Sequence, residues 1–68
     1  MNLTINGKIE RLENVGKLDE LLRELKIGEE EKGFAVALNE EVIFKSAWQN
    51  TILKDADRIE IIRATQGG

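Results

Sequence analysis

The residues with the clearest chemical potential are the last two of the sequence, Gly67 and Gly68. Two glycines add no side chain to a core, so a chain that ends in them calls for another reason. A thread without side chains can enter a channel too narrow for any other residue and present its terminal carboxylate there. The bland alternatives are a frayed chain end or a remnant of cloning.

The segment before this pair determines how far it can reach. Residues 58–64 have the pattern of a strand, and Thr65 and Gln66 connect that strand to the glycines. Four extended residues, 65–68, span at most roughly 13 Å. Because nothing in them can bury apolar surface, we expect a folded domain over residues 1–64 and a flexible tail over residues 65–68.

The residue types that the chain lacks exclude much other chemistry. Without cysteine or histidine, the chain has no disulfide, no zinc site of the Cys/His type, no thiol nucleophile and no histidine acid or base. A formal net charge of −3 argues against nucleic-acid binding, which normally uses a basic patch. The short apolar runs predict neither a signal peptide nor a membrane span, so we expect a cytoplasmic protein.

The first part of the chain predicts a β-hairpin. Strands are expected at 2–5 and 8–12 around Asn6-Gly7, the residue pair that most readily adopts the angles of a type I′ turn. A two-residue turn leaves Ile9 on the face opposite Ile5, whereas a bulged, longer loop brings the two together. The sequence leaves both registers open.

An amphipathic helix is expected at about residues 17–26. Its apolar stripe has the spacing i, i+3, i+4, i+7 and consists of Leu18, Leu21, Leu22 and Leu25. Such a short stripe more often packs on a sheet than pairs with another helix. Lys17 is a poor N-cap, and Gly28 is expected to close the helix in a left-handed conformation.

The second half predicts an exposed loop followed by three more strands. The expected elements are a loop at 29–33, strands at 34–38 and 42–44 around a turn at 39–41, an irregular or 3₁₀ turn at 45–50 anchored by Trp48, and the last strand. Asp55 and Asp57 suggest a metal site, but a tight turn is the better interpretation because the other ligands of a calcium loop are missing. The apolar run Ile59, Ile61, Ile62 is typical of an interior strand buried on both faces.

This order of elements predicts an α+β fold, with a mixed sheet of four to five strands and one main helix on one face. The chain resembles the ubiquitin-like β-grasp superfamily and, within it, the small sulfur carriers of the ThiS family. The resemblance covers the full length. It rests on the Asn-Gly hairpin, the leucine helix, the strand end Ala35-Val36-Ala37-Leu38-Asn39, the run Val42-Ile43, Trp48, the Asp55-x-Asp57 turn and the terminal Gly67-Gly68. In two departures, Lys17 replaces the usual hydroxyl cap and Ala56 replaces the glycine common between the aspartates.

The resemblance implies a carrier protein rather than an enzyme. The carboxylate of Gly68 would be adenylated with ATP and magnesium by a ThiF-type adenylating enzyme, and a sulfur donor such as a cysteine desulfurase would supply the sulfur of a thiocarboxylate. A thiazole synthase would then use that sulfur in thiamine biosynthesis. The chain itself would bind no cofactor and no metal. Alternatives are a molybdopterin-synthase-type carrier, a ubiquitin-like protein modifier and, outside this class, a plain interaction domain.

Partner contacts are expected at the tail and on the uncovered sheet face. Thr65, Gln66 and Gly67 would enter the partner, and Arg58 and Arg63 would rim the docking surface. Because one helix covers only one sheet face, some of the remaining apolar side chains should be exposed there. The candidates are Phe34, Val42, Ile43, Phe44 and Ile62.

Overall fold

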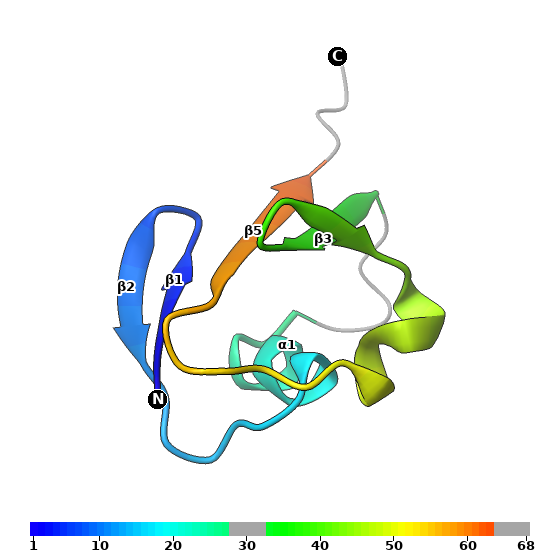
Figure 1. Cartoon of the computed structure of the whole chain (residues 1–68). Coiled ribbons are helices and arrows are strands. Elements are labelled where there is room, and N and C mark those ends of the chain that lie inside the picture. Colours follow the sequence, from blue (N-terminus) through cyan, green and yellow to red (C-terminus); the bar gives the residue numbers. More distant parts are fainter. Residues whose placement is uncertain (28–32, 64–68) are drawn as a thin grey trace.

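The computed structural model describes residues 1–27 and 33–63. Its elements in chain order are β1 (Asn2–Ile5), β2 (Lys8–Arg11), α1 (Leu18–Glu24), β3 (Phe34–Leu38), β4 (Glu41–Ile43), the 3₁₀ helix η1 (Lys45–Asn50) and β5 (Arg58–Arg63) (Figure 1). The strands form one sheet in the order β2-β1-β5-β3-β4. Strands β1 and β5 are parallel, whereas the other neighbours are antiparallel. The predicted fold class is confirmed: this is a mixed five-stranded β-grasp sheet with one main helix.

The first hairpin closes through a two-residue turn. Asn6 and Gly7 have φ angles of 51° and 83°, which are the left-handed values of a type I′ turn. This turn pairs Ile5 with Lys8 and Thr4 with Ile9. Ile9 therefore lies on the sheet face opposite Ile5 and is 73% exposed, which decides between the two registers that the sequence left open.

The second hairpin has the same geometry, and it corrects one predicted boundary. Asn39 and Glu40 have φ angles of 50° and 74°, and Leu38 pairs directly with Glu41. The turn thus has two residues rather than the predicted three, and β4 spans Glu41–Ile43 instead of 42–44. The prediction failed because Glu40 occupies a position at which glycine is the usual signal.

Helix α1 begins without a conventional cap. Lys17 occupies the N-cap position in an extended conformation, but a lysine side chain carries no hydrogen-bond acceptor. Instead, Oε1 of Glu20 accepts hydrogen bonds from the backbone N–H groups of Gly16 at 2.8 Å and Lys17 at 3.0 Å. A carboxylate in the first turn therefore accepts the N–H groups of the N-cap residue and of the residue before it. A serine or threonine side chain at the N-cap would bind N–H groups further into the helix instead.

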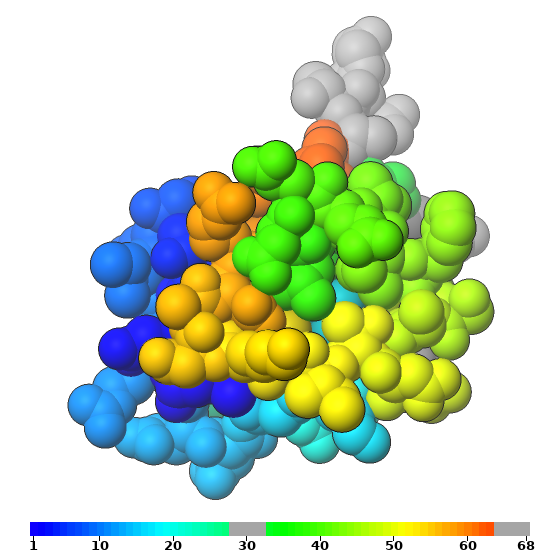
Figure 2. Space-filling model, viewed as in Figure 1, coloured from blue at the N-terminus to red at the C-terminus, as the bar shows by residue number. Residues whose placement is uncertain are grey.

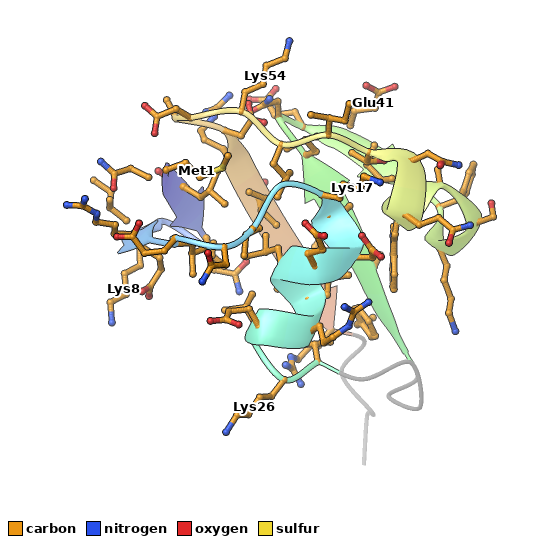
Figure 3. The ribbon with its side chains drawn as sticks, turned by 90° about the horizontal axis from the view of Figure 1, so that it is seen from below. Met1, Lys8, Lys17, Lys26, Glu41 and Lys54 are labelled. Atoms are coloured by element: carbon orange, nitrogen blue, oxygen red, sulfur yellow. The ribbon has the colours of Figure 1, made fainter. Side chains whose placement is uncertain are left out.

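The end of α1 differs from the prediction. Lys26, with φ 62°, is the left-handed residue, whereas Gly28 lies outside the described residues. The N–H of Ile27 bonds to the carbonyl of Leu22, and the N–H of Lys26 bonds to the carbonyl of Arg23. This is a Schellman motif, and its hydrophobic contact is supplied by Ile27, which is buried with Leu22. Figure 3 shows Lys17 and Lys26 at opposite ends of the helix.

The core lies between the sheet and α1. Leu18, Leu21 and Leu22 are each at most 2% exposed, which confirms the predicted leucine face. They pack in one cluster whose other fully or nearly buried members are Leu3, Ile5, Val15, Ile27, Val36, Leu53 and Ile59. Within the described ranges, no helix is long and apolar enough to cross a membrane.

Trp48 anchors η1 as expected. Its Nε1 donates a hydrogen bond to the carbonyl of Ile43 at 3.0 Å, and its ring centroid lies 5.7 Å from that of Phe34. Both side chains pack against the core cluster. The indole therefore connects the end of β4 to the start of β3.

The aspartate turn before β5 is confirmed. Oδ1 of Asp55 accepts the N–H of Asn2 at 2.7 Å, and Oδ2 of Asp57 accepts the N–H of Lys54 at 2.8 Å. Between them, Ala56 has a φ of 74°, a conformation that costs an L-residue about 1–2 kcal/mol. Ala56 is thus held in the conformation that glycine adopts most easily.

We predict that Ala56→Gly stabilises the protein. Glycine removes the steric cost of the left-handed conformation but adds freedom to the unfolded chain, so the net gain in the free energy of unfolding is about 0.5–1 kcal/mol. Urea denaturation measures this value. As a control, Ala37→Gly in β3 should lower it by about the same amount, and a loss of stability in Ala56→Gly would contradict the interpretation.

A second prediction concerns the pH dependence of the helix start. Hydrogen bonds from the N–H groups of Gly16 and Lys17 lower the pKa of Glu20 below its usual 4.5, because they favour the charged form. The ionised carboxylate therefore contributes stability above about pH 4.5, and this contribution is lost as the pH falls through the lowered folded-state pKa.

We expect Glu20→Gln to reduce the free energy of unfolding at neutral pH. The difference in this free energy between the variant and the wild type should become smaller in acid. Denaturant unfolding between neutral and acidic pH measures this difference. Glu24→Gln is the matched control, since it removes the same charge from the same helix and no hydrogen bond described for α1 uses that side chain. A difference for Glu20→Gln that stays constant with pH would contradict the assignment.

Candidate functional site

Strand β5 leads to the predicted functional tail. The tail itself, Thr65, Gln66, Gly67 and Gly68, lies outside the described residues, as does the predicted domain boundary after residue 64. β5 pairs with β1 on one side and with β3 on the other, so the predicted interior position of the last strand is confirmed. The part of the site that the structure describes is therefore the sheet around β5.

The prediction that β5 is buried on both faces is wrong. Ile59 is completely buried and Ile61 is half-buried beneath the sheet, but Ile62 is 52% exposed. Side chains along a strand alternate between the two faces, and α1 covers only one of them. The opposite face, here called the open face, carries Arg58, Glu60 and Ile62 of β5.

Apolar side chains gather on the open face at the end from which the chain leaves β5. Ala35 lies opposite Ile62, and Val42 lies opposite Ala37 in the next row. Phe44 follows Val42 by two residues in extended backbone, so it points to the same side. Val42 and Phe44 are 55% and 76% exposed. These side chains, Ala35, Val42, Phe44 and Ile62, are called the open-face patch, and they confirm that apolar residues remain on the uncovered side.

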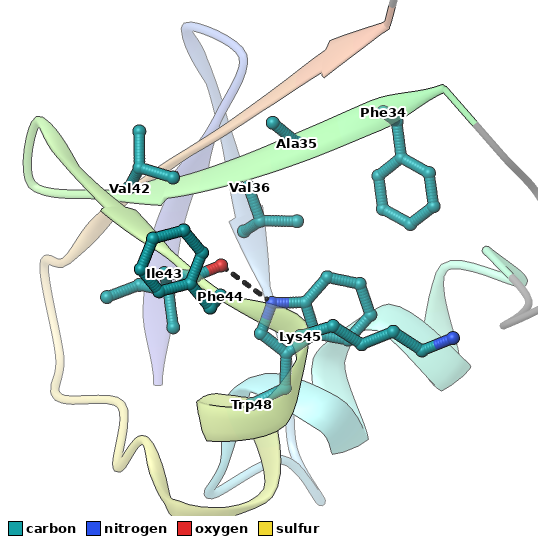
Figure 4. A pocket seen from close by; sticks show the side chains of 8 residues that line it. All are labelled: Phe34, Ala35, Val36, Val42, Ile43, Phe44, Lys45 and Trp48. Atoms are coloured by element: carbon teal, nitrogen blue, oxygen red, sulfur yellow. Dashed lines mark hydrogen bonds between the residues drawn. The ribbon is translucent and has the colours of Figure 1, made fainter.

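Two of the five residues predicted as candidates for this surface face the core instead. Phe34 packs against Trp48 and Ile43 packs against the core cluster. Both alternate with patch residues along β3 and β4, and alternation places them on the side of α1. Figure 4 shows Phe44 and Trp48 near the end of β4, where the hydrogen bond from Trp48 to Ile43 is drawn.

A groove of about 270 Å³ runs along the edge of the sheet beside β4. Its lining joins part of the open-face patch to residues on the core side, and it consists of Phe34, Ala35, Val36, Val42, Ile43, Phe44, Lys45 and Trp48 (Figure 4). Lys45 is the charged member of this set. The exposed apolar surface thus continues from the open face around β4 toward Trp48.

The two predicted rim arginines lie on opposite faces. Arg58 is on the open face, where its Nη2 lies 3.4 Å from Oε2 of Glu40. Arg63 pairs with Phe34 across the sheet, and directly opposite residues share a face. Arg63 therefore belongs to the side of α1, and of the two only Arg58 borders the open face.

Two asparagines whose sequence context indicates only a turn also bind β5. Oδ1 of Asn6 accepts the N–H of Ile61 at 2.7 Å, and Oδ1 of Asn39 accepts the N–H of Arg58 at 2.9 Å. Figure 2 shows the residues around the β3–β4 turn, in green, beside those at the start of β5, in orange. The signal in the sequence was the asparagine at the first position of each turn, but nothing in the sequence indicated which strand its carboxamide contacts.

The described part of the chain offers no metal centre. Among residues 1–27 and 33–63, no three or more acidic side chains lie close enough together to hold a metal ion. The carboxylates of Asp55 and Asp57 instead accept backbone N–H groups, as described above. What this region provides for function is a strand with fixed neighbours and an apolar surface beside it.

Comparison with known proteins decides the family. The model of the ThiS family matches residues 3–68, which includes the terminal glycines. The chain belongs to the ThiS family. Two solved structures agree with this assignment, both of a thiamine biosynthesis protein from Geobacter metallireducens at 37% identity.

The crystal structure of that protein, named ThiS, superposes with a TM-score of 0.82, and each chain is covered completely. Its NMR solution structure superposes with a TM-score of 0.77 over the whole of this chain and 88% of the other. Comparison with curated proteins finds no match. The likeness to ThiS therefore extends over both sequence and fold.

Proposed function

We propose that this protein carries sulfur on the carboxylate of Gly68 for thiazole formation in thiamine biosynthesis. Membership of the ThiS family supports a sulfur-carrier role in that pathway, and the family match runs through residue 68. This match to the end of the chain is the observation that carries the proposal. It favours the thiamine carrier over the molybdopterin carrier, the protein modifier and the plain interaction domain.

The proposed chemistry activates a carboxylate that is otherwise a poor electrophile. A carboxylate oxygen of Gly68 attacks the α-phosphorus of ATP, and pyrophosphate leaves to give an acyl adenylate. A persulfide on the donor then attacks the acyl carbon, and AMP leaves to give an acyl disulfide. A thiol attacks the donor's sulfur of that disulfide, which breaks the S–S bond, forms a new disulfide with the donor and releases the thiocarboxylate, so that sulfur replaces one carboxylate oxygen. The chain has no cysteine or histidine, which suits a protein that is a substrate of these steps and leaves ATP, magnesium and catalysis to the adenylating enzyme.

We further propose that the open-face patch docks the adenylating enzyme. The patch exposes the side chains of Val42, Phe44 and Ile62, and contiguous exposed apolar surface commonly marks a protein interface. It lies at the end of the sheet where β5 leads toward Gly68, so one partner can bind the patch and receive the tail. Thiazole synthase and the sulfur donor are the other partners of the proposed cycle.

The docking proposal predicts that Phe44→Glu and Ile62→Glu each weaken binding to the cognate adenylating enzyme by about tenfold or more. A buried, unpaired carboxylate is unfavourable in an apolar interface. Isothermal titration calorimetry measures the affinity. Both variants should keep the wild-type free energy of unfolding to within about 0.5 kcal/mol, since the side chains are on the surface.

Ile52→Glu is the control for this experiment. Ile52 is 67% exposed but lies outside the open-face patch. It forms a β-bridge with Lys17 at the start of α1. Its substitution should leave the affinity within about twofold of wild type. Unchanged binding by both patch variants would remove the docking role.

The carrier proposal predicts a specific change in mass. After incubation with ATP, magnesium, the cognate adenylating enzyme and a sulfur donor, the protein should gain one sulfur in place of one oxygen, and tandem mass spectrometry should locate the change on Gly68. Deletion of Gly68 should abolish the modification. Gly67→Val should reduce it severely, because a branched side chain restricts the backbone and widens the thread.

Lys17→Thr provides the control for the modification assay. The substitution introduces a hydroxyl at the N-cap of α1 and is expected to add on the order of 1 kcal/mol of stability. It should leave the modification unchanged. The carrier proposal fails if the intact chain is never adenylated, or if a variant without both glycines restores thiamine synthesis in a carrier-deficient cell.

A further inference from the structure

The second half of β5 has lost its strand neighbour on one side. β1 pairs with β5 only through Thr4 with Arg58 and Ile5 with Ile59, because the chain turns away at Asn6. β5 continues to Arg63, and β3 accompanies it to that residue on the other side. Beyond Ile59, β5 therefore has no strand on its β1 side within the described residues.

The carboxamide of Asn6 takes that place. The backbone N–H of Asn6 bonds to the carbonyl of Ile59 at 2.9 Å, as in a continuing parallel ladder. The next bond of such a ladder would join the N–H of Ile61 to the backbone carbonyl of Asn6. With a φ of 51° at Asn6, the side chain provides the acceptor instead, and Ile61 donates to Oδ1 at 2.7 Å.

Asn39 makes the equivalent contact at the opposite end of the strand. Its backbone N–H bonds to the carbonyl of Arg58 at 2.8 Å, and its Oδ1 accepts the N–H of Arg58 at 2.9 Å. Its Nδ2 also donates to Oδ1 of Asp57 at 3.0 Å. The two turn asparagines thus bind β5 in the same way, Asn39 at the entry of the strand and Asn6 near its exit.

We propose that Asn6 is a positioning residue for the reaction at Gly68, because its carboxamide extends the β1 ladder by one hydrogen bond, to Ile61, and so restrains β5 on the side that β1 has left. This inference rests on the proposed function. With Asn6 on one side and β3 on the other, β5 is hydrogen-bonded on both sides as far as Ile61, which limits the movement of the strand that leads to Gly68. Correct placement of a reacting group is worth large factors in rate.

The test compares the same substitution in the two turns. Asn6→Gly and Asn39→Gly both keep a residue that tolerates positive φ, and both remove the carboxamide that binds β5. Asn39→Gly removes more hydrogen bonds in total, so it is a stringent control for effects of stability. Asn6→Asp is the conservative variant, since it keeps an Oδ1 acceptor and tolerates the left-handed conformation.

Adenylation kinetics give the functional readout. We expect kcat/KM for the carrier to fall by about tenfold in Asn6→Gly, with Asn39→Gly and Asn6→Asp staying within about twofold of wild type. Rates are expressed per folded molecule, with the folded fraction measured by circular dichroism. Hydrogen exchange of the Ile61 amide should accelerate in Asn6→Gly and stay slow in the other two variants.

The possible outcomes separate this inference from the function on which it rests. If the wild-type chain is never adenylated, the proposed function fails and the positioning role fails with it. If wild type is adenylated but the two glycine variants have equal kcat/KM, only the positioning role is overturned. Failure of Asn6→Asp to retain activity would also contradict it, because the acceptor would then not be the feature that matters.

Discussion

A central strand needs hydrogen-bond partners on both sides, and in this fold that strand is β5. Its neighbours are far apart in the sequence, since β1 begins the domain and β3 follows the helix. β3 pairs along the strand as far as Arg63, whereas β1 stops after two residues. The side chains of Asn6 and Asn39 supply acceptors that the backbone of the turns does not, in hydrogen bonds at the solvent-exposed surface. Asparagine suits both positions because it tolerates the left-handed conformation and carries an acceptor close to the main chain.

The single helix imposes the second constraint. A chain of 68 residues buries only about 60% of the surface that its unfolded form exposes, and a seven-residue helix covers one face of the sheet. The core therefore gathers between α1 and the inward side chains. The outward apolar side chains at one end of the sheet stay exposed, so an apolar surface lies next to the strand that leads to the tail.

Several turns are held by hydrogen bonds, some local and some between distant residues, rather than by residue types that favour the turn conformation. Lys26, Glu40 and Ala56 all adopt positive φ angles, each at a cost of about 1–2 kcal/mol. In each case nearby hydrogen bonds favour the conformation: the Schellman bonds follow Lys26, the Asn39 contacts precede Glu40, and the aspartate carboxylates flank Ala56. Glu20 similarly replaces the missing N-cap of α1. The strain of a positive φ angle at these residues is thus offset by the hydrogen bonds of the turn.

The sequence by itself determined the elements and the class of fold. The 3.6-residue spacing of four leucines and the two-residue alternation of the strands arise from local backbone geometry, so both could be predicted from residue types alone. Equally local signals predicted the Asn-Gly turn and the aspartate turn. They also predicted the anchoring role of Trp48 and the interior position of the last strand. The terminal glycines and the absence of cysteine and histidine are likewise properties of the residue types alone, and they fit the carrier role that the resemblance implied.

Only the tertiary structure decided which partner each group meets. The placement of Arg63 on the helix side and the exposure of Ile62 depend on which strands pair and on which face α1 lies, and these are contacts between distant parts of the chain. The register of the first hairpin is local, but the sequence was compatible with two turn lengths and the structure has the shorter one. Lys26 and Glu40 adopt left-handed conformations, and neither residue type predicts this from the sequence as glycine would. The bonds from Asn6 and Asn39 to β5 span 55 and 19 residues, and no local pattern specifies an interaction over that separation because its geometry exists only once the strands have paired.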